Sequence, residues 1–84
     1  MEIKKRKKIL PEYFIAVRLG IKTCELRKDD SDYKAGDTII LAEWENGKYT
    51  GREIAVEITY IMRNLPEYGL KDGYAILCFK KKGE

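Results

Sequence analysis

Apolar and polar residues alternate along most of the chain, and this pattern predicts a protein built mainly from β-strands. Strands are expected at residues 5–10, 23–28, 38–45, 52–62 and 74–81. Segment 52–62 alternates most regularly and places five apolar residues on one face: Ile54, Val56, Ile58, Tyr60 and Met62. Segment 74–81 is apolar on both faces, which is typical of a strand inside a sheet.

One helix is predicted between the first two strands, over residues 11–19. Pro11 suits its first position, where no hydrogen bond from the backbone nitrogen is needed, and Glu12 suits the positive end of the helix dipole. Gly20 ends the helix because glycine readily adopts the left-handed conformation. The helix is apolar on nearly all sides, so it is expected to be buried or to line a groove. The predicted core aromatics are Tyr13, Phe14, Tyr60 and Phe79.

Together these elements predict an α+β fold, namely a small mixed β-barrel of five to six strands or a strongly curled sheet, with the helix near the N-terminus plugging one end. Asn46-Gly47 is the strongest hairpin signal in the chain. The length of 84 residues suits a single domain spanning residues 1–84. If the first and last strands pair, the lysine runs at the two ends become neighbours.

The formal net charge of +3 is distributed unevenly. Residues 1–8 and 80–84 together carry eight basic and two acidic side chains, whereas residues 9–79 carry nine basic and twelve acidic ones. Two interpretations follow. Either the basic ends form one patch for a polyanion, or they are two solvated tails that aid solubility.

Several classes of chemistry are excluded by residues that the chain lacks. It contains no histidine and a single serine, Ser31, so catalytic triads and zinc sites that need an imidazole are excluded. We expect neither a cofactor nor a metal. Cys24 and Cys78 lie in apolar runs without CxxC spacing, which favours buried thiols. Without a long apolar stretch or a signal peptide, the chain is expected to be a cytoplasmic monomer with no membrane partner.

The densest group of chemically useful side chains lies between Gly20 and Arg27. Lys22 lies in the turn after the helix, and Thr23, Glu25 and Arg27 project from one face of the next strand over roughly 7 Å. A lysine, a hydroxyl, a carboxylate and a guanidinium together can bind a phosphate or a base edge. The alternative is a solvated strand face on which Glu25 and Arg27 neutralise each other.

The order Gly20-x-Lys22-x-x-Glu25-x-Arg27 resembles the GxKxxExR signature of the ASCH domain, a small β-barrel relative of PUA domains found in bacteria and phages. Further similar segments cover residues 8–14, 27–30, 33–37, 49–53 and 68–74. The resemblance therefore extends over nearly the whole chain. It implies a PUA-like barrel, a cleft between the early helix and the adjoining strands that is lined by the signature residues, and a role in RNA binding.

A hydrolase branch of the same superfamily removes acyl groups from modified cytidine nucleosides, using a lysine, a threonine three positions later and a distant glutamate. This chain has Glu25 at the threonine position, and Thr23 directly follows Lys22. The resemblance thus implies an alternative function, an amidohydrolase of acylated cytidines, with Lys22, Thr23, Glu25 and Glu57 as candidate catalytic residues. As a base, Lys22 would have to lose its proton, whereas binding a phosphate requires no such change, so binding is the preferred hypothesis.

Aromatic residues in or beside loops are candidates for stacking on unpaired bases. They are Tyr33, Trp44, Tyr49, Tyr68 and Tyr74. The preferred hypothesis is a module that binds RNA or a modified nucleoside or nucleotide through the cleft lined by the signature residues and through the basic ends of the chain. Its expected binding residues are Lys5, Lys7, Lys22, Thr23, Glu25, Arg27, Lys28 and Tyr68. A third hypothesis, a domain that docks a protein partner, rests on the apolar residues Ile15 and Leu19.

Overall fold

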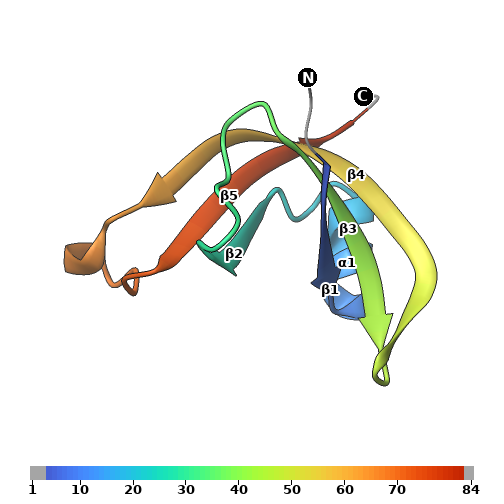
Figure 1. Cartoon of the computed structure of the whole chain (residues 1–84). Coiled ribbons are helices and arrows are strands. Elements are labelled where there is room, and N and C mark those ends of the chain that lie inside the picture. The colour runs from blue at the N-terminus through green and yellow to red at the C-terminus, as the bar shows by residue number, and fades with distance from the viewer. Residues whose placement is uncertain (1–3, 83–84) are drawn as a thin grey trace.

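The computed structural model describes residues 4–82, and within them it contains five strands, one α-helix and one short 3-10 helix (Figure 1). In chain order these are β1 (Lys4–Ile9), α1 (Pro11–Arg18), β2 (Cys24–Lys28), β3 (Thr38–Glu45), β4 (Lys48–Arg63), η1 (Pro66–Tyr68) and β5 (Tyr74–Lys81). The predicted α+β class, with a curled sheet and one helix near the N-terminus, is confirmed.

All five strands form one mixed sheet in the order β1-β3-β4-β5-β2. Strand β1 runs parallel to β3, and the other neighbours are antiparallel. The sheet curls into a half-barrel, and α1 lies in its hollow (Figure 1). The barrel prediction allowed the first and last strands, β1 and β5, to pair. They do not, because β5 already has β4 and β2 as neighbours.

The two basic segments nevertheless lie at the same end of the sheet. Lys5 is level with Ile39, Ile39 with Val56, and Val56 with Lys81, so these four residues form one row across four strands. Three inter-strand steps separate Lys5 from Lys81, about 14 Å along the sheet. The two lysine runs therefore approach each other without pairing.

The hydrophobic core fills the concave side of the sheet. The helix contributes Phe14 and Val17, and the strands and the loop before β3 contribute the rest: Ile9, Tyr33, Ile39, Leu41, Val56, Ile58, Ala75, Leu77 and Phe79. Phe14 and Phe79 are therefore core residues as predicted, with 2% and 5% of their surface exposed. Among the described residues, no helix is long and apolar enough to cross a membrane.

Helix α1 ends where the sequence predicts, for a reason visible in its hydrogen bonds. Gly20 has a φ of +78°, in the left-handed region that glycine tolerates. Its N–H donates to Val17 O at 3.0 Å, and the N–H of Ile21 donates to Ala16 O at 2.9 Å. These two bonds form a Schellman motif, which satisfies the last carbonyls of the helix and turns the chain toward β2.

Two predicted core aromatics are exposed instead. The pairing of β4 with β5 shifts register between Ile58 and Tyr60, and this irregularity reverses the alternation of the strand. Ile61 consequently packs against the core, whereas Tyr60 is 64% exposed. Tyr13 is 44% exposed because α1 faces the core with Phe14 and Val17, and Tyr13 is not on that side of the helix.

Strand β2 buries the polar face rather than the apolar one. Glu25 is buried, while Leu26 is 63% exposed on the outer face and Cys24 is exposed beside it. The prediction of buried thiols is therefore wrong for Cys24, and Cys78 is only partly covered. The charged network described below makes this orientation possible.

We predict that Leu41→Ala destabilises the fold by about 3 kcal/mol, because Leu41 is 1% exposed and its truncation leaves a cavity in the core. Urea unfolding followed by circular dichroism measures this loss. Leu26→Ala is the matched control, since Leu26 is largely exposed, and its effect should stay within about 0.5 kcal/mol. Equal losses in the two variants would contradict the assignment of the core to the concave side.

Candidate functional site

The end of α1 fixes the position of Lys22. The backbone N–H of Lys22 donates to Ala16 O at 3.0 Å, which holds the residue against the last turn of the helix. One residue later, Thr23 O accepts a hydrogen bond from Phe79 N at 3.0 Å. Lys22 and Thr23 thus lie between the C-terminal end of α1 and the last residues of β5.

Glu25 lies between two cations. Lys22 Nζ donates to Glu25 Oε1, and Arg27 Nη1 donates to Glu25 Oε2 at 3.0 Å. The exposed fractions of the Lys22, Glu25 and Arg27 side chains are 22%, 11% and 23%. Both carboxylate oxygens are paired, so the cost of burying the charge is offset by partners on two sides. The signature residues form a compact, half-buried ion network with one net positive charge.

Arg27 also connects the two edges of the sheet. Its Nη1 donates to Lys8 O at 3.0 Å, and this contact joins the edge strand β2 to the edge strand β1. Arg27 therefore stabilises the curled form of the sheet by linking its two edge strands, in addition to pairing with Glu25.

A pocket of about 200 Å³ opens beside this network, and we call it the lysine pocket. Its lining residues come from the end of α1, the turn before β2 and the end of β5: Val17, Gly20, Lys22, Thr23, Phe79, Lys80 and Lys81. Val17 and Phe79 are core residues, so the wall is apolar, and the lining includes three lysines. Lys81 is paired with Val56 on the inner face, whereas Lys80 is paired with Glu57 and projects toward the outer face at the edge of the pocket. Such a pocket offers an anion-binding rim and a surface for an apolar or aromatic group.

Lys5 and Lys7 point to the inner side of β1 but bind to the loop before β3. Lys5 Nζ forms an ion pair with Asp37 at 3.2 Å, and Lys7 Nζ donates to Ser31 Oγ at 2.6 Å. Both ammonium groups lie within 6.0 Å of the ring centroid of Tyr33. These lysines fasten the loop to β1, and they do not line the lysine pocket.

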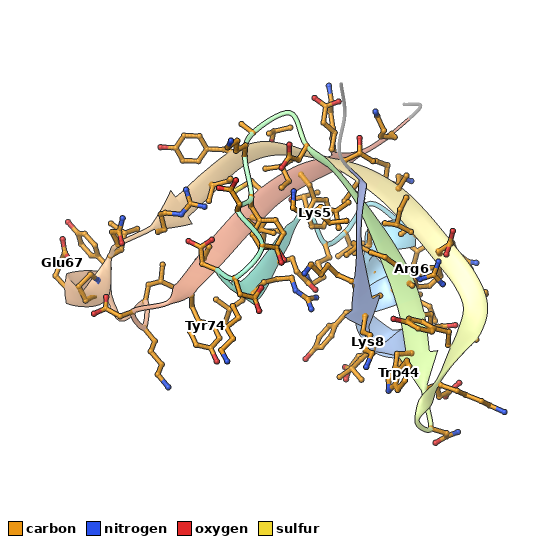
Figure 2. All side chains as sticks on the ribbon, in the orientation of Figure 1. Lys5, Arg6, Lys8, Trp44, Glu67 and Tyr74 are labelled. Atoms are coloured by element: carbon orange, nitrogen blue, oxygen red, sulfur yellow. The ribbon has the colours of Figure 1, made fainter. Side chains whose placement is uncertain are left out.

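Three further predicted residues lie elsewhere. Lys28 is exposed at the end of β2, opposite Tyr74. Glu57 points to the outer face, because its neighbours Val56 and Ile58 point into the core. Tyr68 is 81% exposed and belongs to η1, the short helix that carries the labelled Glu67 in Figure 2. This helix precedes the start of β5, whereas the lysine pocket lies at the end of β5. Of the predicted site residues, the pocket contains Lys22 and Thr23, with Glu25 and Arg27 in the adjoining network.

Lys80 and Lys81 are not among the individually predicted site residues, although binding through the basic ends is part of the preferred hypothesis. They belong to the basic run at the end of the chain, but only the sheet topology brings the end of β5 to the turn after α1. Lys81 Nζ donates to Arg18 O at 2.9 Å, which ties β5 to the last turn of the helix. Among residues 4–82, no group of three or more acidic or cysteine side chains is placed to hold a metal ion.

A second buried carboxylate, Glu43, is paired separately from the lysine pocket. It is 1% exposed and accepts hydrogen bonds from Arg52 Nε at 2.8 Å, Arg52 Nη2 at 2.7 Å and Thr50 Oγ1 at 2.7 Å. The hydrogen bonds from Arg52 and then Thr50 lower the pKa of Glu43 below its ordinary value of 4.5. The same contact with Glu43 raises the pKa of Arg52. This bidentate pair is a structural contact within the β3–β4 hairpin.

The outer side of β1 carries a cation–aromatic cluster. Lys8 Nζ lies 3.9 Å from the Trp44 ring centroid, and the Arg6 guanidinium lies 4.7 Å from that of Tyr49 (Figure 2). Trp44 and Tyr49 meet edge to face at 4.9 Å. Their rings are thus engaged by neighbours within the protein.

Comparison with known proteins gives two matches. The family model described as "Domain of unknown function (DUF3850)" matches residues 5–79, which is most of the chain. A curated relative, described as an uncharacterized 12.9 kDa protein in the GpA 3′ region of Escherichia phage P2, is 46% identical over 52 residues. That alignment covers 62% of this chain and 48% of the phage protein, so it spans about half the length of the relative.

We predict that acid destabilises the fold partly through Glu43. Because its pKa is lowered in the folded state, Glu43 contributes stability at pH values above its unfolded pKa, and this contribution is lost as the pH falls through the folded pKa. Thermal unfolding of the protein measured between about pH 6 and pH 2 should show this loss below the ordinary range of glutamate.

The matched variant is Glu43→Gln, which keeps the shape but removes the titrating group. It should be less stable than the parent at pH 6, and its stability should fall less steeply below pH 4.5. Glu67→Gln, a change in the exposed helix η1, should leave the profile unchanged. Parallel acid profiles for the parent and Glu43→Gln would contradict the assignment.

Proposed function

The chain belongs to the DUF3850 family, and we propose that it binds single-stranded RNA, holding one nucleotide unit in the lysine pocket. One observation carries this proposal. Three residues of the signature segment, Gly20, Lys22 and Thr23, line the same pocket as two of the C-terminal basic run, Lys80 and Lys81. Two features that are separate in the sequence thus meet at one place in the fold.

The charge at the rim favours an anionic ligand. The described residues that line the pocket include three lysines and no carboxylate. Ammonium groups bind phosphate oxygens in their ordinary protonated form. Thr23 is exposed and adds a hydroxyl that can donate a hydrogen bond to a phosphate or a sugar oxygen.

The size of the pocket favours one unit of a longer ligand. About 200 Å³ is smaller than the roughly 300–1,000 Å³ of pockets that enclose a whole small molecule. A base or a phosphate group can enter while the rest of the strand lies on the surface. The Phe79 ring and the aliphatic side chain of Val17 line the apolar wall, where their small exposed surfaces, 5% and 1%, can contact a base or a ribose.

The resemblance to ASCH domains supports the same ligand class, and we propose that this DUF3850 domain is a relative of them. The signature residues Lys22, Glu25 and Arg27 form one connected network beside the pocket. In this proposal Lys22 contacts the ligand, while Glu25 and Arg27 are positioning residues that hold the Lys22 ammonium group at the rim.

The geometry favours binding over the amidohydrolase alternative. Glu57, the distant carboxylate of that hypothesis, points to the outer face of the sheet, away from the lysine pocket. Lys22 Nζ already donates to Glu25 and is therefore engaged as a hydrogen-bond donor in the ion network. Binding uses these groups as they stand, whereas the proposed hydrolysis would require Glu57 to act at the pocket from the outer face of the sheet.

We predict that binding to a labelled single-stranded RNA weakens steeply with salt. Contacts with three phosphates would give a slope of log K against log salt of about −2. The double variant Lys80→Ala/Lys81→Ala should weaken binding about tenfold and reduce the magnitude of the slope by about 1.4. Fluorescence anisotropy at several salt concentrations measures both quantities.

Lys71→Ala is the charge-matched control, because Lys71 precedes β5 at the end of the strand that is remote from Lys80 and Lys81. It should leave the affinity and the salt slope nearly unchanged. A parallel titration with a mononucleotide distinguishes a polymer from a small ligand. Equal losses in the control and the double variant, or no binding of either ligand, would overturn the proposal.

A further inference from the structure

The two cysteines of the chain face each other across neighbouring strands. Cys24 on β2 and Cys78 on β5 are directly opposite in the antiparallel register. Residues directly opposite in a sheet project to the same side, here the outer face. Cys24 is exposed, Cys78 is partly exposed, and both are free thiols in the structure.

The hydrogen bonds on either side identify the type of pair. Phe79 N donates to Thr23 O at 3.0 Å, and Asp29 N donates to Gly73 O at 2.8 Å. Hydrogen-bonded and non-hydrogen-bonded pairs alternate along antiparallel strands, so the pair next to Thr23 and Phe79 belongs to the non-hydrogen-bonded set. Cys24 and Cys78 form that pair.

A non-hydrogen-bonded pair has the spacing that a disulfide needs. Its Cα atoms lie about 4.5 Å apart and its side chains approach each other more closely than in the hydrogen-bonded pairs. Disulfides span Cα separations of about 4.4–6.8 Å. The backbone therefore already holds the two thiols within the range of a covalent bond, and only side-chain rotation is needed to form it.

We propose that Cys24 and Cys78 are a redox modification site. A low-molecular-weight disulfide such as glutathione disulfide oxidises the two thiols, which join in a reversible intramolecular disulfide. One cysteine thiolate, formed by loss of a proton, attacks a sulfur of the oxidant and releases one glutathione thiolate. The opposite cysteine, also deprotonated, then attacks the protein sulfur of the mixed disulfide and releases the second glutathione thiolate. The two protein thiols are oxidised, and the oxidant is reduced to two thiols.

The exposure of the two thiols sets the order of attack. Cys24 is exposed at an edge strand and is the thiol that a dissolved oxidant reaches most easily. Cys78, on the inner strand β5, is then the resolving thiol.

The modification would act on the strand that carries Glu25 and Arg27. Strand β2 is at an edge, so β5 is its sole neighbour in the sheet. A bond between positions 24 and 78 ties β2 to β5 and closes a long segment of chain, which stabilises the fold by restricting the unfolded state. After reduction, β2 is again attached by its backbone pairing with β5 and by the hydrogen bond from Arg27 to Lys8 O.

The test treats the purified chain with glutathione disulfide. We expect the intact mass to fall by two hydrogen atoms, and tryptic peptides 23–27 and 72–80 to be recovered as one linked species under non-reducing conditions. The thermal midpoint should rise by about 10 °C. Dithiothreitol should restore the original mass, separate the linked peptides and return the thermal midpoint to its starting value.

The matched control, Cys24→Ser/Leu26→Cys, moves one thiol to the next outward position of the same strand. Leu26 is largely exposed and level with Ile76, so the new thiol would be diagonal to Cys78, about 7–8 Å away. This variant should form the internal link at least about tenfold more slowly and accumulate mixed disulfides instead. The proposal is overturned if the parent chain yields mainly mixed disulfides or covalent dimers, or if the control closes equally fast.

Discussion

The structure depends on ion pairs that compensate two carboxylates, because the curl of the sheet buries these carboxylates away from water. Glu25 and Glu43 both lie on the concave side, where an uncompensated carboxylate would cost several kcal/mol. Glu25 is compensated by Lys22 and Arg27, and Glu43 by Arg52. These pairs determine which face of β2 is buried, hold the β3–β4 hairpin and place a lysine at the rim of the pocket. At Glu25, the same ion network therefore serves both the stability of the fold and the position of a lysine in the candidate site.

Local signals predicted the elements well because each one is determined within a few residues. Pro11 and Gly20 bracket α1, with the end supported by the Schellman hydrogen bonds. Asn46 and Gly47 both have positive φ, as a tight hairpin turn requires. The apolar character of residues 74–81 correctly indicated an interior strand. The residues of the signature segment, Lys22, Glu25 and Arg27, form one ion network, but of these three only Lys22 lines the pocket, and their role as a binding site stays a prediction.

The remaining features depend on contacts between distant segments, which periodicity does not report. The register shift after Ile58 exposes Tyr60, although the sequence continues to alternate. Leu26 is exposed because the ion network outweighs its preference for burial. The contribution of Lys80 and Lys81 follows from the strand order, since β5 ends beside the turn after α1.

The position of β1 and β2 at opposite edges has a consequence for how the molecule folds. The β3–β4 hairpin joins residues close in sequence and can form early, whereas Lys5 must find Ile39 and Cys24 must find Cys78 across long intervening segments. Loop-closure entropy opposes such contacts until the centre of the sheet exists. We therefore expect the chain to acquire its edges last, so that the ion network of Glu25 on β2 is completed after the centre of the sheet has folded.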